Sequence, residues 1–320
     1  MFKFLGIFSF IFFLNLKVLA SETTGVITTI QPINSLVSSV IGNTGKTISL
    51  IPSQVSPHEY KLKPSDIKKL QNANIIFFVS HHLETRMTKV FKNLPKNIKI
   101  INLMENSGIK NLAIRDNQAW ERNDHQHKNE VKDRHYKYSK KHNDHNHYEK
   151  EDDVHIWLSP DNAVKIIQKV NKELSLIFPE NDQIFKQNAN QMITKIKQLK
   201  IELKNELSSI RDKPYVVFHD AYQYFENRFG VSSAGALTLN PDVLPGAKQI
   251  DAIQDLIQDK NIKCIFSEPQ YNPKIIETLA ADMKISTGIM DPLGAFIDQG
   301  PEMYQNLILD IANSLKDCGK

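Results

Sequence analysis

Short apolar runs rich in β-branched residues alternate along this chain with segments of helical periodicity. Such alternation is typical of mainly parallel sheets covered by helices, and it predicts an α/β fold. In the first half of the chain we expect strands at residues 25–30, 47–52, 75–79 and 98–102. Helices are expected between them, at residues 32–41 and 64–72.

The same pattern returns near the end of the chain. Strands are predicted at residues 215–218, 263–267 and 285–290, and helices at residues 247–258, 273–282 and 303–316. The length of 320 residues also exceeds what one hydrophobic core usually serves. We therefore expect two α/β lobes, an N-terminal one at residues 21–178 and a C-terminal one at residues 211–320.

One apolar stripe runs through residues 181–210, between the two predicted lobes. Lys and Glu occupy the opposite face, so the segment is predicted to form a single helix. About thirty helical residues reach ~45 Å, the length of a whole domain. We expect a rigid linker helix at residues 179–210 that lies against both lobes. A coiled-coil arm is the alternative, and it is less favoured because only about four heptads are present. The stripe comprises Phe185, Ala189, Met192, Ile196, Leu199, Leu203, Leu207 and Ile210.

Residues 1–20 have the features of an export signal. Lys3 gives a positive start, residues 5–16 are almost wholly apolar, and Val18-Leu19-Ala20 matches a signal-peptidase site. We therefore expect a cleaved signal peptide at residues 1–20. An uncleaved anchor is the alternative, although the apolar run is shorter than the ~20 residues that span a bilayer. No cysteine comes directly after the run, which argues against a lipid anchor.

Two cysteines are present, Cys264 and Cys318. In an exported chain, two cysteines without a third suggest one disulfide. It would close a loop of about 55 residues and stabilise the fold by roughly 4 kcal/mol in the chain-entropy account. Two free thiols are the alternative.

Residues 121–153 differ from the rest of the chain. They combine histidines with Asp, Glu, Lys and Asn, and Val131 is their only aliphatic residue. Such a segment cannot bury enough surface to order itself, so we expect a mobile loop inserted into the first lobe. It is either an accessory metal-binding loop or a tolerated solvated insertion. Its histidines are His125, His127, His135, His142, His145 and His147.

Three histidines and one aspartate outside this loop lie in similar places. His58, His219 and Asp291 follow predicted strands, and His155 precedes a helix capped by Ser159. Ligand sites of open α/β sheets form where such loops converge. Three imidazoles and one carboxylate would make a tetrahedral site that suits zinc. Each residue alone is weak evidence, because a single histidine after a strand is more often an ordinary surface residue.

The strings that contain these residues are Pro57-His58-Glu59-Tyr60 with Pro64-Ser65-Asp66, His155-Ile156-Trp157-Leu158-Ser159-Pro160, Phe218-His219-Asp220-Ala221-Tyr222-Gln223-Tyr224-Phe225 and Asp291-Pro292-Leu293-Gly294. Together they resemble the periplasmic zinc-binding proteins of bacterial high-affinity zinc ABC importers, the ZnuA type. The resemblance covers essentially the whole mature chain, in order. It includes the histidine-rich insertion, the two cysteines and residues 266–270.

This resemblance implies two Rossmann-like lobes joined by a long helix, with a zinc ion held in the cleft between them. It implies His58, His155 and His219 as zinc ligands, and the pair Cys264 and Cys318 as a disulfide. The expected action is capture and release of zinc as the transported ligand. Because the long helix limits how far the lobes can swing, we expect only small rearrangement.

The fourth ligand stays open. Some zinc-binding relatives have an acidic residue before the first ligand histidine, where this chain has Pro57. The fourth position is then Asp291, Glu59 or a water, and Asp291 is preferred. Manganese-binding relatives usually carry a carboxylate at the position of His219, so the imidazole here favours zinc.

The resemblance implies high-affinity zinc capture in the periplasm and delivery to the transmembrane permease of an ABC importer, by a monomer. The alternatives are a manganese or iron solute-binding protein or a metal-dependent adhesin of the same fold. A secreted zinc hydrolase is less favoured, because no His-Glu-x-x-His or similar motif is present. We therefore expect no enzyme. Nucleic-acid binding is not expected either, because the net charge of +4 is small and the basic residues are interleaved with acids.

Two further sequence features lie near the expected cleft. His81 and His82 follow the strand predicted at residues 75–79 and are interpreted as a surface pair rather than ligands. Glu268 is interpreted either as a partner that orients a ligand histidine or as a cap of the turn before Pro269.

Overall fold

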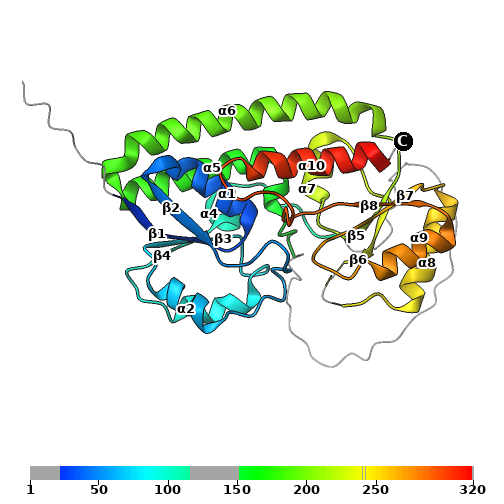
Figure 1. Ribbon diagram of the computed structural model, residues 1–320, viewed down its shortest axis with the longest axis horizontal. Coiled ribbons are helices and arrows are strands. Elements are labelled where there is room, and N and C mark those ends of the chain that lie inside the picture. The colour runs from blue at the N-terminus through cyan, green and yellow to red at the C-terminus, as the bar shows by residue number, and fades with distance from the viewer. Residues whose placement is uncertain (1–21, 116–150, 240, 242, 319–320) are drawn as a thin grey trace, which may run out of the picture.

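Two four-stranded sheets lie side by side in the computed structural model, and a long helix runs along both of them (Figure 1). The structure describes residues 22–115, 151–239, 241 and 243–318. Within each sheet every pair of neighbouring strands is parallel. The prediction of an α/β fold with two mainly parallel sheets and a long helix is therefore confirmed.

The first sheet has the strand order β2-β1-β3-β4. Val26 of β1 lies opposite Thr47 of β2 and Ile75 of β3, which fixes the register. Each predicted strand is present, displaced by at most three residues at either end. The elements are β1 (Thr23–Thr28), α1 (Gln31–Ile41), β2 (Gly45–Ser49), α2 (Pro64–Gln71), β3 (Ile75–Phe78), α3 (Thr88–Lys92), β4 (Lys99–Asn102) and α4 (Leu103–Asn106).

The second sheet repeats this order as β6-β5-β7-β8. Strand β6 has no counterpart in the sequence prediction, because the run from Gly235 to Thr238 has little of the β-branched or aromatic enrichment that marks a strand. Helix α7 was likewise not predicted. The elements are β5 (Val216–His219), α7 (Gln223–Phe229), β6 (Gly235–Thr238), α8 (Ala247–Asp259), β7 (Cys264–Ser267), α9 (Lys274–Met283) and β8 (Ser286–Ile289).

Each sheet has a point at which its strand order reverses, between β1 and β3 in the first and between β5 and β7 in the second. Ligand sites of open α/β sheets lie at the carboxyl ends of the strands beside this point. His219 ends β5, and Glu268 directly follows β7. The topology therefore brings these two side chains to the switch point of the second sheet.

The long helix α6 (Asp182–Glu206) continues into a 3₁₀ turn at Leu207–Ile210. All eight residues of its predicted stripe are buried. They pack on α1 and on α5 (Pro160–Ile177), which starts at the predicted Ser159 cap. The coiled-coil alternative is wrong, because this chain's own helices cover the stripe.

A second helix also connects the two halves. Helix α10 (Met303–Cys318) begins against α1, where the Tyr304 main-chain N–H donates to Ser35 Oγ at 2.9 Å. Its last residue, Cys318, forms a disulfide with Cys264 of β7, and the two Cα atoms lie 5.8 Å apart. The predicted disulfide is confirmed, and the alternative of two free thiols is wrong. None of the described helices has the length and apolar character of a membrane span.

Candidate metal centre

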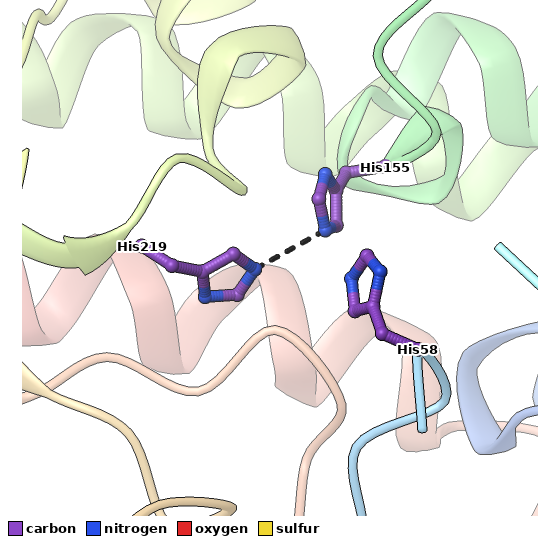
Figure 2. Close-up of side chains that lie close together, drawn as sticks. All are labelled: His58, His155 and His219. Atoms are coloured by element: carbon purple, nitrogen blue, oxygen red, sulfur yellow. Dashed lines mark hydrogen bonds between the residues drawn. The ribbon is translucent and has the colours of Figure 1, made fainter. Parts of the chain in front are cut away.

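Three histidines from distant parts of the chain lie close together, and Figure 2 shows their rings side by side. One ring nitrogen of each lies within 4.8 Å of the others. His58 comes from the loop after β2, His155 from the turn before α5, and His219 from the end of β5. The structure thus brings together the three histidines that the sequence singled out. Their ring centroids are 5.2–6.0 Å apart.

His219 is held from behind by Glu268. Its Nδ1 lies 2.6 Å from Glu268 Oε1, and both side chains are almost fully buried. Burial alone would lower the pKa of His219, but the Glu268 carboxylate, with help from Asp220 and Asp153, outweighs it and raises the pKa. The prediction that Glu268 orients a ligand histidine therefore agrees with its position.

His155 has a similar partner. Asp153 Oδ1 accepts two hydrogen bonds from it, one from the main-chain N–H at 2.9 Å and one at Nδ1 at 2.8 Å. Both residues are buried. The two contacts fix the turn as well as the ring, because they join the same carboxylate oxygen to the backbone and the side chain of His155.

His58 is half-buried and its loop is held by the opposite lobe. Tyr271 Oη lies 2.9 Å from Ser56 Oγ, and Gln270 Nε2 donates to the Ser53 carbonyl at 2.7 Å. Burial lowers the pKa of His58 well below its usual value, and the nearby rings of His155 and His219 lower it further. The ring is therefore neutral, with a lone pair free for binding a cation.

The carboxylates decide which nitrogen of each buried histidine faces the cleft. An ionised carboxylate only accepts hydrogen bonds, so Nδ1 of His155 and of His219 carries the proton. Each Nε2 then presents a lone pair, and the two Nε2 atoms lie 3.3 Å apart. Two lone pairs that face each other at this distance repel, and a proton or a metal ion between them would relieve the repulsion. A small cavity of about 10 Å³, the size of one small ion or water, is lined by the three histidines together with other residues such as Glu268 and Tyr271.

The structure does not bring Asp291 to this group. Its carboxylate accepts hydrogen bonds from the main-chain N–H groups of Leu293 and Ala295 and from Gln270 Nε2. Asp291 thus shapes its own turn, and through Gln270 it supports the contact with the His58 loop. Glu59 is exposed and is not part of the group either.

A larger cavity of about 400 Å³ opens beside the histidines and is lined by His58, His155 and Asp220, among others. His81 and His82 are exposed, in agreement with the predicted surface pair, although His82 reaches the edge of this cavity. Burial raises the pKa of Asp220 to about 7, although the nearby Arg115 counteracts the rise.

The histidines of the predicted loop, His125 to His147, lie outside the described residues, as does the predicted signal peptide. The predicted end of the loop at Asp153 is wrong. Residues 151–153 pair with residues 112–114 through an antiparallel bridge between Ala113 and Asp152. The Asp153 N–H donates to the Leu112 carbonyl at 2.7 Å. This backbone pairing orders a polar segment whose composition alone suggested disorder.

Sequence reasoning missed Asp153, Asp220 and Arg115 as residues of the site. Asp153 lies two positions before a candidate ligand, which is a usable signal because a carboxylate that holds a metal-binding histidine is common. Asp220 directly follows another candidate. Arg115 has no such signal, because only the folded chain brings it beside Asp220.

Comparison with known families gives a match over residues 26–318 to the family described as the periplasmic zinc-uptake complex component A. The high-affinity zinc uptake system protein ZnuA of Brucella abortus is 37% identical, and the match covers 94% of this chain and 93% of that protein. The protein of the same name from Haemophilus ducreyi is 32% identical, with 92% of each chain covered.

Solved structures of similar fold are also found. The laminin-binding adhesin of Streptococcus agalactiae superposes with a TM-score of 0.74 at 20% identity, over 92% of this chain and 100% of that chain. A crystal structure of ZnuA gives a TM-score of 0.73, also at 20% identity and with the same coverage. A manganese-bound periplasmic metal-binding protein from Candidatus Liberibacter asiaticus gives 0.71 at 21% identity, over 92% of this chain and 98% of that chain. At these identities the likeness concerns the fold alone.

Proposed function

The chain belongs to the family of periplasmic zinc-uptake component A proteins, and on this premise we propose that it captures zinc and delivers it to an ABC importer. The observation that carries the proposal is the convergence of His58, His155 and His219 with two Nε2 lone pairs facing each other. We propose these three side chains as the zinc ligands.

The geometry of the two buried histidines fits zinc. Zn–N bonds of ~2.0–2.1 Å at tetrahedral angles separate two bound nitrogens by about 3.3 Å. The Nε2 atoms of His155 and His219 are 3.3 Å apart. Imidazole nitrogens also suit zinc better than they suit manganese, which prefers oxygen ligands. Asp291 is held in its own turn. The fourth ligand is therefore a water, or a neighbouring carboxylate that reaches the ion after a small displacement.

Two lobes contribute ligands, which gives the site a means of release. His58 belongs to the lobe proposed at residues 21–178, His219 to the lobe at residues 211–320, and the helix at 179–210 joins them. A small shift of the loop that carries a ligand on one lobe therefore removes that ligand from the ion. Ligand exchange of this kind involves no catalysis. We propose that the signal peptide at residues 1–20 directs the chain to the periplasm, where it acts as a monomer and docks on a transmembrane permease.

The proposal is tested by titrating the mature, metal-free protein with zinc in competition with a chromophoric chelator. Changing His58, His155 or His219 singly to Ala should weaken zinc binding at least about a hundredfold, because each change removes one direct ligand bond. His81→Ala is the matched control, because this exposed histidine lies outside the cluster, and it should leave the affinity unchanged. Full affinity in all three variants would refute the proposal, and tighter binding of manganese than of zinc would refute the assignment of the metal.

The histidine-rich segment is proposed as an accessory zinc-binding region. Deleting residues 121–150 retains the ordered residues 151–153 that hold His155. We expect the tight site to keep its affinity while weaker zinc equivalents are lost. An unchanged total stoichiometry would show that the segment binds no zinc.

A further inference from the structure

Basic residues are concentrated on one layer of the first lobe. Between residues 60 and 98 every exposed charged side chain is basic. The acidic residues of this stretch, Asp66 and Glu84, are buried and hydrogen-bonded within the fold. We call the exposed set the basic face. It comprises Lys61, Lys63, Lys68, Lys69, Arg86, Lys89, Lys92 and Lys96.

The fold brings these residues to the same side of the first sheet. Helix α2 connects β2 to β3 and α3 connects β3 to β4, so both crossovers run in the same direction along the strand order β2-β1-β3-β4. Right-handed crossovers that run in one direction lie on one face of a sheet. Helix α1 crosses in the opposite direction and packs with α5 and α6. Figure 1 accordingly shows α2 and α6 on opposite sides of the sheet.

The corresponding layer of the second lobe has no such excess of positive charge. Helices α8 and α9 connect the equivalent strands of a sheet with the same order. Their exposed charges have both signs, as is usual for a solvated surface. The basic face is therefore a feature of the first lobe and does not follow from the architecture that both lobes share. The exposed charges of α8 and α9 are Lys248, Lys274, Asp251, Asp255, Asp259, Glu277 and Asp282.

The charges of the basic face are available to a partner. Lys69 lies 3.5 Å from Asp66, and the other members form no ion pair with a described residue. A positive surface repels a zinc ion, so this face does not serve the capture of the ion. Its charges are spread over two helices and the loops beside them, and none lines either cavity at the histidines. An extended anionic surface therefore suits them better than one small anion.

The basic face adjoins the cavity that leads to the histidines. Thr85 lines this cavity of about 400 Å³ together with His58 and His155, and Arg86 follows Thr85 in the chain. A partner that covers the basic face therefore lies next to the cavity.

We propose that the basic face holds the protein on the surface of a bilayer that contains anionic phospholipids. Anionic headgroups attract clustered lysines and arginines, and each such residue strengthens binding by about fivefold. The inference goes beyond zinc capture and rests on the proposed function only for its purpose, because a transmembrane permease lies in a bilayer. Binding through this face brings the cavity beside the membrane surface.

The test is sedimentation of the mature, zinc-free protein with phospholipid vesicles at about pH 8, where ordinary histidines are neutral. Vesicles of phosphatidylglycerol mixed with phosphatidylcholine are compared with vesicles of phosphatidylcholine alone. The wild type should sediment with the anionic vesicles only. Salt at about 1 M should release it, because screening then acts within about 3 Å.

A variant with four changes on the basic face identifies the surface that binds. Lys61→Gln, Lys68→Gln, Lys89→Gln and Lys92→Gln together should weaken binding to the anionic vesicles at least about tenfold. The matched control removes four exposed lysines from α6 on the other side of the molecule, and it should bind like the wild type. Its changes are Lys186→Gln, Lys195→Gln, Lys197→Gln and Lys204→Gln.

Zinc titration without lipid is the second measurement on each variant, and unchanged affinity shows that the variant is folded. Equal binding of the two variants to the anionic vesicles would overturn the inference, because net charge would then matter and its position would not. Failure of the wild type to bind these vesicles would also overturn it and would leave an acidic protein surface as the partner. Neither outcome affects the proposed zinc capture, which is measured in the absence of lipid.

Discussion

At the scale of single residues, the site is defined by the carboxylates behind the histidines. Asp153 and Glu268 hold the Nδ1 atoms of His155 and His219 and so direct both Nε2 lone pairs to one point. Such contacts fix the tautomer and the ring orientation and increase the basicity of the ligand. The metal-free protein therefore has two of its three proposed ligands preorganised.

Replacing either carboxylate should weaken zinc binding without unfolding the protein. For Asp153→Asn and Glu268→Gln we expect zinc affinity to fall by about tenfold to a hundredfold, because the ring loses its charged partner. Glu173→Gln is the matched control, since Glu173 is also buried but pairs with Lys169 on α5. Competition titration measures the affinity, and the spectrum of the cobalt-loaded protein reports the ring orientation. Equal effects of all three changes would contradict a role in positioning.

Glu84 makes stability depend on pH. This buried carboxylate accepts hydrogen bonds from Thr29 Oγ1, from the Val79 N–H and from the Ser80 N–H, and so links the ends of β1 and β3. Burial raises its pKa from 4.5 to about 7, although the hydrogen bonds oppose the rise. The folded state therefore holds a proton that the unfolded state releases between these two values. The contribution of Glu84 to stability should fall as pH rises through this window and stay constant above it.

The effect is measured by comparing urea unfolding of the metal-free wild type with that of Glu84→Gln from pH 5 to pH 8. The glutamine variant should be less stable throughout, because its amide nitrogen cannot accept a hydrogen bond. The difference in the free energy of unfolding between the two proteins should shrink as pH rises to about 7. The other titrating groups contribute equally to both proteins and therefore do not affect this difference. A difference that does not vary with pH would contradict the assignment.

At the scale of elements, helix α6 is stabilised by its packing rather than by its own sequence. Its buried side chains form one face, and Lys186, Lys195 and Lys200 on the other side form ion pairs at the surface. Exposed pairs of this kind contribute little. The helix therefore depends on the lobes that it joins, and this dependence fixes it to both of them.

Two neighbouring positions on α6 test this packing. Leu203 is fully buried, whereas Ile201 is 57% exposed. Leu203→Ala should lower the free energy of unfolding by about 2–5 kcal/mol, because it leaves a cavity. Ile201→Ala should change it by no more than about 0.5 kcal/mol, as is usual at the surface. Urea unfolding of the metal-free protein gives both values, and similar losses would contradict the described orientation of the helix.

At the scale of the whole molecule, several restraints limit the movement of the lobes. Helix α6 lies along both halves, and α10 is tied to β7 by the disulfide. Hydrogen bonds across the cleft add to these, from Gln54 to the Ala295 carbonyl and from Trp157 Nε1 to the Pro292 carbonyl, each at 2.8 Å. Release of an ion then requires a local shift of a ligand loop rather than a wide hinge motion.

We therefore expect small-angle X-ray scattering of the mature protein to give the same radius of gyration with zinc and with a chelator. Helices that span both lobes resist the bending that a hinge requires. Hydrogen exchange should instead increase locally, in the loop that carries His58, when zinc is removed. A clear expansion of the whole molecule in the chelator would contradict this expectation.

The sequence by itself determined the α/β class, the long helix, the disulfide and the three histidines. The fold class and the long helix depend on local information, because periodicity marks an amphipathic helix and a short apolar run between turns marks a buried strand. The disulfide followed instead from the presence of two cysteines without a third in a chain expected to be exported. His58, His155 and His219 were found because they stand in distinctive strings next to such elements. Strand β6 was missed because its short run from Gly235 has only a weak local preference for the extended conformation.

Only the tertiary structure decided which partners these side chains have. Asp291 was expected to complete the site, but main-chain N–H groups of its own turn and Gln270 occupy its oxygens. Asp153 was assigned to a loop, yet backbone pairing with residues 112–114 orders it. The pairing of Arg115 with Asp220 joins residues more than a hundred positions apart. A carboxylate binds whichever donor or cation the folded chain brings within reach, and a linear sequence does not contain that distance.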